Sequence, residues 1–369
     1  MSQSLRPEPK QAVQDLLTYR PSFGTADNGR LIRLSANEGA LGASPKVASF
    51  LDNSGTELHR YPEIQDPALH QAIARRYSLN AEQILSSNGS DELIALLALA
   101  YLEPGDEVIH SQYAFLVIPQ AVRIAGGVPV AAADDGLTVS VDNLLAAVGP
   151  RTKMVFLVNP NNPTGTMIPF EEVERLHAGL PPHVMLVLDW AYAEYLDDGF
   201  SDKAARMVEA HDNVVMTRTF SKLHGLASLR LGWAYCPDHV VTALGSIRGP
   251  FSVNDVAAKA GAIAIEDTDF QALSISHNEK WIKLMTEFLN QQGFDVTPSV
   301  TNFILIRFNP ETGPSASDAA AFMAERGVLL RTMHPYGLDS YLRMSMGTDD
   351  EMEVVKDCFA ALRLRYPAQ

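Results

Sequence analysis

The sequence predicts an α/β protein whose large domain is a mainly parallel sheet sandwiched by helices. Two observations predict this fold: short, mainly apolar runs recur along the chain, and amphipathic stretches with helical periodicity separate them. Strands of a parallel sheet are buried on both faces, so they are apolar throughout, and a helix usually joins one strand to the next. The runs lie at residues 107–110, 128–133, 153–158, 184–188 and 214–217.

The pattern changes near residue 266, where a second, smaller α+β domain is predicted. Apolar residues at helical spacing indicate a long helix over 266–292. The elements expected after it are a strand at 302–308, a helix at 319–326, strands at 328–333 and 341–346, and a last helix at 349–365. We therefore expect an N-terminal segment, 1–45, that lies on the small domain or on a dimer partner, a large domain, 46–265, and a small domain, 266–369.

Composition excludes several classes of protein. The chain has 369 residues, a net charge of −15 and only two cysteines. A phosphate backbone needs a basic face, so no nucleic-acid partner is expected. The histidines form no HExxH motif, so no metal site is expected. The longest apolar run, 93–102, is too short to span a bilayer, and the N-terminus lacks the apolar stretch of a secretion signal. With so few cysteines, these features predict a cytoplasmic protein without a membrane partner.

Reactive side chains follow three successive apolar runs. Asn162 lies in the stretch NPNNPTG after the first run, Asp189 ends the second and is followed by Tyr192. Lys222 follows the third. The carboxyl ends of parallel strands meet at one edge of a sheet, where ligands bind in open α/β folds. The sequence therefore predicts a site at which an amide, a carboxylate, a phenol and an amine converge.

An anion cradle is predicted beside this site. Residues 87–92, SNGSDE, precede an apolar helix, so free backbone N–H groups and the positive helix end are expected to face an anion. Thr219, Ser221 and Arg230 add two hydroxyls and a guanidinium. A lysine that can hold an aldehyde, a carboxylate for a ring nitrogen and a phosphate cradle are what the cofactor pyridoxal 5′-phosphate (PLP) requires.

The motifs resemble those of the fold-type I PLP-dependent aminotransferases of class I/II, and most closely those of the histidinol-phosphate aminotransferases. They span residues 34–347 in the family's order, and the run NPxNPTG, D-x-x-Y, S-K-x-x-G-L-A-x-x-R is specific for the superfamily but much less so for the substrate. The matching segments are LSANEGALGASP, HRYPE, SNGSDELI, NPNNPTG, LDWAYAEY, TFSKLHGLASLRLGW, TNFILIRF and YLRMSMG. The resemblance implies a PLP-transferase fold of type I with a seven-stranded type of sheet, and PLP as the cofactor.

The resemblance also implies roles for single residues. Lys222 resembles the lysine that forms the Schiff base and then moves the proton, and Asp189 resembles the partner of the pyridine nitrogen. Asn162 and Tyr192 are similar to the donors on the ring oxygen. The phosphate-binding set that the family implies is Gly89, Ser90, Asp91, Thr219, Ser221 and Arg230.

Two tyrosines are implied to contact the cofactor. Tyr61 in HRYPE resembles the tyrosine that reaches the cofactor phosphate of the other subunit, which implies a homodimer. Tyr113 occupies the place of the aromatic residue that stacks on the ring. The chain reads HSQYAF where the family has a proline-led pattern, so Phe115 is a rival for that role. An isolated tyrosine is often a packing residue, and that interpretation stays open for both.

Arg331 and Arg343 are expected to recognise the substrate. In the histidinol-phosphate enzymes the arginines of these motifs hold the substrate phosphate, and in relatives that act on ordinary amino acids the later arginine holds the α-carboxylate. Asn37 and Tyr19 resemble N-terminal pocket residues of the family. The expected reaction exchanges an amino group between L-histidinol phosphate and 2-oxoglutarate, with imidazole acetol phosphate as the oxo form.

Other interpretations stay open from the sequence. Taken singly, Lys222 fits a surface lysine, Asp189 a helix cap and Arg331 an ion-pairing strand residue. His224, beside the lysine, is expected to pack rather than to transfer protons. An aromatic or broad-specificity aminotransferase and a PLP decarboxylase of a phosphorylated amino acid are alternative functions. A regulator with a PLP fold would carry a basic DNA-binding domain, and a dinucleotide oxidoreductase would carry G-x-G-x-x-G after its first strand; the sequence has neither.

Overall fold

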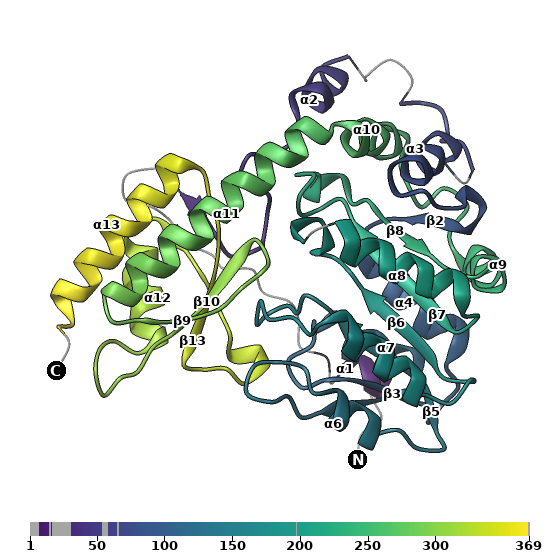
Figure 1. Cartoon of the computed structure of the whole chain (residues 1–369), viewed down its shortest axis with the longest axis horizontal. Coiled ribbons are helices and arrows are strands. Elements are labelled where there is room, and N and C mark those ends of the chain that lie inside the picture. The colour runs from purple at the N-terminus through teal and green to yellow at the C-terminus, as the bar shows by residue number, and fades with distance from the viewer. Residues whose placement is uncertain are drawn as a thin grey trace.

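The computed structural model describes residues 7–14, 16, 31–53, 58–64, 66–196 and 198–367. Its larger part, the large unit, is built on a seven-stranded sheet (Figure 1). The order across this sheet is β2 (Ile84–Ser87), β8 (Gly232–Tyr235), β7 (Val214–Thr219), β6 (Met185–Asp189), β5 (Thr152–Val158), β3 (Glu107–Ser111) and β4 (Val128–Ala132). The strands from β7 to β4 are parallel, and β8 is antiparallel to both neighbours. The predicted mainly parallel sheet is confirmed.

Helices cover both faces of this sheet, because alternate residues of each strand point to opposite faces. Along β5, Val155 and Leu157 belong to one apolar core and Met154 and Phe156 to another. The helices of the large unit are α2 (Pro45–Leu51), α3 (Pro67–Tyr77), α4 (Ser90–Tyr101), α5 (Val117–Ala125), α6 (Val141–Ala146), α7 (Phe170–Gly179), α8 (Asp198–Ala210), α9 (Asp238–Ile247) and α10 (Asp255–Glu266). Shorter helical elements are α1 (Gln11–Gln14), η1 (Ala81–Gln83), η2 (Ala193–Tyr195) and η3 (Ala227–Leu229). No helix among the described residues is long and apolar enough to cross a bilayer.

The small unit is a four-stranded antiparallel sheet packed on helices (Figure 1). Its strand order is β12 (Arg331–Thr332), β13 (Tyr341–Ser345), β10 (Phe303–Arg307) and β9 (Asp295–Thr297). A separate parallel pair joins β1 (Ile32–Arg33) to β11 (Val328–Leu329), so the N-terminal strand lies on this unit. The helices are α11 (Thr268–Gln291), α12 (Ala316–Glu325) and α13 (Asp349–Arg365), with the 3-10 turn η4 (His334–Tyr336).

Two element predictions differ from the structure, whereas the helix expected over 266–292 is confirmed as α11. That helix begins directly after Asp267, whose carboxylate accepts a hydrogen bond from Lys46 Nζ at 2.6 Å. The strand expected over 328–333 is divided into β11 and β12, because the two halves pair with different strands. The strands β2, β8 and β9 were not predicted, since each has only three or four residues.

A connecting segment, here called the strap (residues 34–44), runs from β1 to α2 and crosses the lysine loop (residues 220–226). The two segments touch backbone to backbone. A Cβ atom at Gly39 would stand 2.7 Å from the Lys222 carbonyl oxygen, and one at Gly225 would overlap the carbonyl of Gly42. Gly225 also has a φ of 67°, which side chains disfavour. These glycines let the strap lie directly against the loop that carries Lys222.

Candidate active site

Lys222 follows β7 and lies at the carboxyl edge of the large sheet, as predicted. Its Nζ donates a hydrogen bond to the strap carbonyl of Ala36 at 3.3 Å and stands 5.9 Å from the centre of the Tyr192 ring. Burial, aided by the positive charge of Arg343, lowers the pKa of the amine to about 8. The amine is therefore partly neutral, and able to attack a carbonyl carbon, near neutral pH.

Asp189 ends β6, the neighbour of β7, and is 3% exposed. One carboxylate oxygen accepts a hydrogen bond from the backbone N–H of Ala191 at 3.3 Å. Burial raises the pKa of this carboxyl to about 7, and the hydrogen bond from Ala191 only partly opposes that rise. A buried carboxyl group with a raised pKa is stabilised in its ionised form by a cation that contacts it.

Tyr192 and Asn37 are joined across the two units. The Asn37 side-chain amide donates to the Tyr192 hydroxyl at 2.7 Å, and its backbone N–H donates to Ser345 Oγ at 2.8 Å. Asn37 has a φ of 56°, a left-handed conformation that asparagine tolerates. Burial raises the pKa of the Tyr192 phenol, so this group stays protonated and can donate.

Two buried arginines lie side by side on the small sheet. Arg331 and Arg343 are directly opposite each other on β12 and β13, so their side chains share one face. Arg343 donates to Asn162 Oδ1 at 2.5 Å and to the carbonyl of Ser35 at 3.0 Å. Like charges placed opposite each other on neighbouring strands repel, so this pair is suited to an anion.

The cradle forms where α4 begins. Gly89 has a φ of 84°, and a Cβ atom there would stand 2.5 Å from Arg230 Nη2, so the guanidinium lies directly against the turn. Arg230 Nη2 is also 3.5 Å from an Asp91 oxygen. Thr219 Oγ1 accepts from the backbone N–H of Ser221 at 3.1 Å. Together with Ser90 at the first position of α4, the predicted phosphate-binding residues thus come from two segments that meet.

The structure separates Tyr113 from Phe115. Tyr113 packs in an apolar cluster with Leu305 of the small unit, and its backbone carbonyl accepts from Asn161 Nδ2 at 3.2 Å. Phe115 packs against the core between the sheet and α4. Tyr113 therefore lies on the side of the site that faces the small unit.

Tyr61 and Tyr19 are not placed with the other site residues. Tyr61 is 81% exposed and stacks on Phe251 with a ring-centre distance of 4.4 Å. Tyr19 lies outside the described residues.

Sequence reasoning missed several residues that order the site. Ser345 lies two positions after Arg343, so strand alternation places both on one face, and this signal was available in YLRMSMG. Arg218 is a charged residue within the apolar strand β7, which indicates a buried partner; that partner is Glu194, at 2.9 Å. His224, which was expected to pack, does pack on Phe220 near this pair, and burial lowers the pKa of His224 to about 4.

These groups define an enzyme site for carbonyl and amine chemistry: an amine of lowered pKa, a buried carboxylate, an anion cradle and two arginines. The chain belongs to the aminotransferase class I and II family, whose sequence model matches residues 30–357. It is 47% identical over 352 residues to a histidinol-phosphate aminotransferase of Rhodospirillum centenum, covering 95% of this chain and 97% of the relative. A histidinol-phosphate aminotransferase of Nitrobacter winogradskyi is 44% identical over 354 residues, covering 95% and 97%.

A solved structure has the same architecture. The histidinol-phosphate aminotransferase of Sinorhizobium meliloti in complex with pyridoxal-5′-phosphate superposes with a TM-score of 0.86 and 26% identity, over 98% of this chain and 100% of that chain.

Proposed function

We propose that this chain is a PLP-dependent histidinol-phosphate aminotransferase, which exchanges the amino group between L-histidinol phosphate and 2-oxoglutarate. One observation carries the substrate proposal: two buried arginines face the same side of the small sheet, and one of them reaches Asn162 in the lysine site. The relatives that are 44–47% identical over 95% of the chain carry this name, which supports the proposal.

The residues present fit PLP. A Cβ atom at Gly89 would fill the space beside Arg230, so the turn is shaped for close approach of a phosphate to backbone N–H groups. The carboxylate of Asp189 suits a protonated ring nitrogen. When bound, PLP supplies an aldehyde for amine exchange and a ring that withdraws electrons. The residues proposed to hold its phosphate are Gly89, Ser90, Asp91, Thr219, Ser221 and Arg230, and those proposed for its ring are Asn162, Asp189, Tyr192, Lys222 and Tyr113.

The chain's own groups then have distinct tasks. Lys222 Nζ, with its lowered pKa, holds the cofactor and carries a proton to and from the substrate carbon. The Asp189 carboxylate keeps positive charge at the ring nitrogen, and the Tyr192 hydroxyl, oriented by Asn37, donates to the ring oxygen. Arg331 and Arg343 bind the substrate anion, which is a phosphate in one half-reaction and a carboxylate in the other. Asn37 and Tyr19 complete the substrate pocket.

We further propose a cytoplasmic homodimer in which Tyr61 contacts the cofactor phosphate of the partner. The exposed stack of Tyr61 on Phe251 supports this proposal, since a large exposed aromatic pair is favoured at an interface. We also propose that the chain is divided into an N-terminal segment, 1–45, a large domain, 46–265, and a small domain, 266–369. We propose no nucleic-acid or membrane partner. Light scattering of the purified protein tests the dimer.

Steady-state kinetics test the reaction. With 2-oxoglutarate as acceptor, we expect kcat/KM to be higher for L-histidinol phosphate than for phenylalanine. The reverse order would contradict the substrate proposal. Lys222→Ala is expected to lower kcat by about a thousandfold or more, whereas Lys283→Ala, an exposed lysine on α11, leaves it unchanged. Borohydride treatment and peptide mapping should find the reduced cofactor on Lys222.

A further inference from the structure

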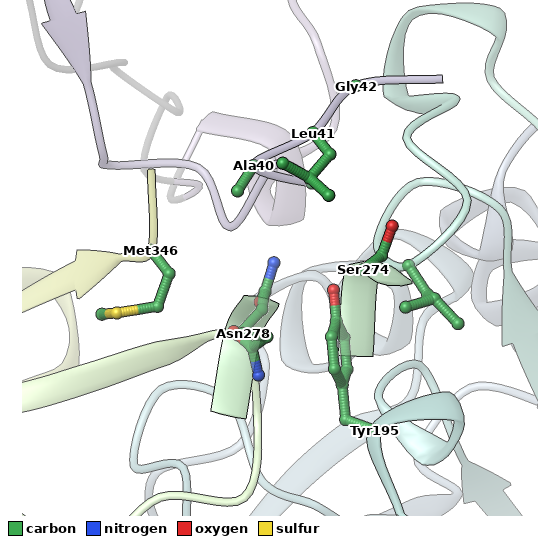
Figure 2. Close-up of a pocket in the computed structure, with 10 residues that line it drawn as sticks. Ala40, Leu41, Gly42, Tyr195, Ser274, Asn278 and Met346 are labelled. Atoms are coloured by element: carbon green, nitrogen blue, oxygen red, sulfur yellow. The ribbon is translucent and has the colours of Figure 1, made fainter. Parts of the chain in front are cut away.

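A small cavity lies beneath the strap, between the two units, and Leu223 of the lysine loop is among the residues that line it (Figure 2). Its walls come from the strap, the lysine loop, η2, α11 and the starts and ends of the small-sheet strands. The cavity leaves about 10 Å³ for the centre of a water molecule, which is close to the room that one molecule needs.

Polar atoms in this wall lack partners among the residues that the structure describes. They are Asn278 Oδ1, Asn302 Oδ1 and Ser274 Oγ. Asn278 and Asn302 are 7% and 3% exposed, so solvent does not satisfy these oxygens. A buried polar atom without a partner costs about 1–3 kcal/mol, and native proteins seldom leave several in one place.

The orientation of both amides is fixed by their nitrogen atoms. Asn278 Nδ2 donates to the carbonyl of Thr301 at 2.9 Å. Asn302 Nδ2 donates to the strap carbonyls of Asn37 and Glu38 at 3.0 and 3.2 Å. Both oxygens are therefore acceptors on the cavity side, and the Tyr195 hydroxyl lies within interaction range of the Asn302 side chain.

The hydroxyls around the cavity complement these acceptors. Ser274 lies one turn before Asn278 on α11, so both side chains are on one face of that helix. Figure 2 shows the Tyr195 hydroxyl directed into the space below Ala40 and Leu41, with Ser274 and Asn278 beside it. Burial raises the pKa of Tyr195, so its hydroxyl stays protonated. Two acceptors and two hydroxyls match the two donors and two lone pairs of a water molecule.

We propose that this cavity binds one water molecule that donates to the amide oxygens of Asn278 and Asn302 and joins the two units, and that Asn302 is a positioning residue for the strap. Asn302 donates to the carbonyls of two successive strap residues, Asn37 and Glu38, and Asn37 in turn orients Tyr192. The neighbouring strap carbonyl, Ala36, accepts from Lys222. The water thus supports Asn302, which binds the strap at the residues that follow the Lys222 acceptor.

A crystal structure of the holoenzyme that resolves ordered waters tests the site, and this test does not depend on the substrate. We expect one density peak within about 3.2 Å of both amide oxygens. Absence of a peak would overturn the proposal. Crystals grown in rubidium chloride and measured at the rubidium edge distinguish a water molecule from a monovalent cation. An anomalous peak at this position would show a bound cation and overturn the water proposal. Density without an anomalous peak would support the water.

Matched variants test the positioning role. Asn302→Asp keeps an acceptor toward the cavity but places a second oxygen against the strap carbonyls. We expect kcat to fall about tenfold with a shift in the pH titration of the bound cofactor's visible absorbance. Asn290→Asp makes the same chemical change at an exposed position of α11, and we expect that titration to stay unchanged. An unchanged titration in Asn302→Asp, or equal shifts in both variants, would overturn the positioning role; if Asn302→Asp does not fold, the crystallographic result decides the water site.

Discussion

Arg343 of the small unit donates a hydrogen bond to Asn162 of the large unit at 2.5 Å, and both side chains are buried. The same guanidinium donates to the strap carbonyl of Ser35. One side chain therefore contacts the strap, the NPNNPTG segment and, in the proposed function, the substrate anion. The planar shape of the arginine guanidinium is required for these simultaneous contacts, because it carries several donors in fixed directions, whereas a lysine ammonium is a single point charge.

Arg343→Lys is therefore expected to lower kcat/KM for L-histidinol phosphate by about ten- to a hundredfold, the effect of losing one hydrogen bond to a charged group. Arg307→Lys, an exposed arginine at the end of β10, is the matched control and should change kcat/KM little. Equal effects of the two substitutions would contradict the role given to Arg343.

Asp189→Asn is expected to have opposite effects on the cofactor-free and the cofactor-bound chain. Burial raises the pKa of Asp189 from 3.8 to about 7, so the folded chain keeps a proton that the unfolded chain has lost. The contribution of this group to stability falls as pH rises between these values. At pH 8 the variant without cofactor should melt about a few degrees higher, while its affinity for PLP should fall. A lower melting temperature without cofactor would show that the buried charge has a partner in the chain itself.

The amine of Lys222 is expected to react with aldehydes at a lower pH than an ordinary lysine. Its pKa of about 8 is depressed from 10.5 because the group is buried. The neutral amine is the nucleophile, so the rate at which the cofactor-free chain takes up PLP should rise with pH and level off above about pH 8. Stopped-flow absorbance measures this rate. A midpoint near 10.5 would contradict the lowered pKa.

Gly89→Ala is expected to weaken PLP binding, because the new methyl group would stand 2.5 Å from Arg230. Gly105→Ala is a matched control: Gly105 has a φ of 94° against 84° for Gly89, but nothing lies within 4 Å of its Cβ position. Both variants should lose about 1 kcal/mol of stability from backbone strain. Only Gly89→Ala should raise the Kd for PLP, measured by fluorescence titration. If both raise it alike, strain and not the cradle is responsible.

The buried pair Arg218–Glu194 is expected to govern stability. Arg218 is 1% exposed, 2.9 Å from Glu194, and its guanidinium lies 4.8 Å from the Tyr77 ring centre. Arg218→Met leaves an uncompensated buried carboxylate and should cost about 3–5 kcal/mol in unfolding free energy. The double variant Arg218→Met, Glu194→Gln should recover part of that loss in denaturant titrations. Without any recovery, the loss would come from packing instead.

The position of the proposed catalytic groups could be predicted from the sequence because it follows from a simple rule of topology. Parallel strands end at one edge, so Asn162, Asp189 and Lys222 had to lie together once the apolar runs were recognised as neighbouring strands. The short strands β2 and β8 escaped prediction, because four residues carry too little periodicity to distinguish them from loops.

The contacts between the two units could not be predicted in this way. Asn37 and Tyr192 are 155 positions apart, and their contact depends on the left-handed backbone at Asn37 and on the path of the strap. Asn302 presents no chemical motif, and its importance is visible only from the carbonyls that it binds. Tyr61 is exposed on this chain, so the role proposed for it requires a second subunit, which one sequence does not place.

The glycine contact between strap and lysine loop has a mechanical consequence. Because no side chain separates Gly39 from the Lys222 carbonyl or Gly225 from Gly42, neither segment can shift without pushing the other. The strap begins at β1, which is paired into the small unit. A displacement of the small unit toward the large sheet would therefore be transmitted through the strap to the loop that carries Lys222.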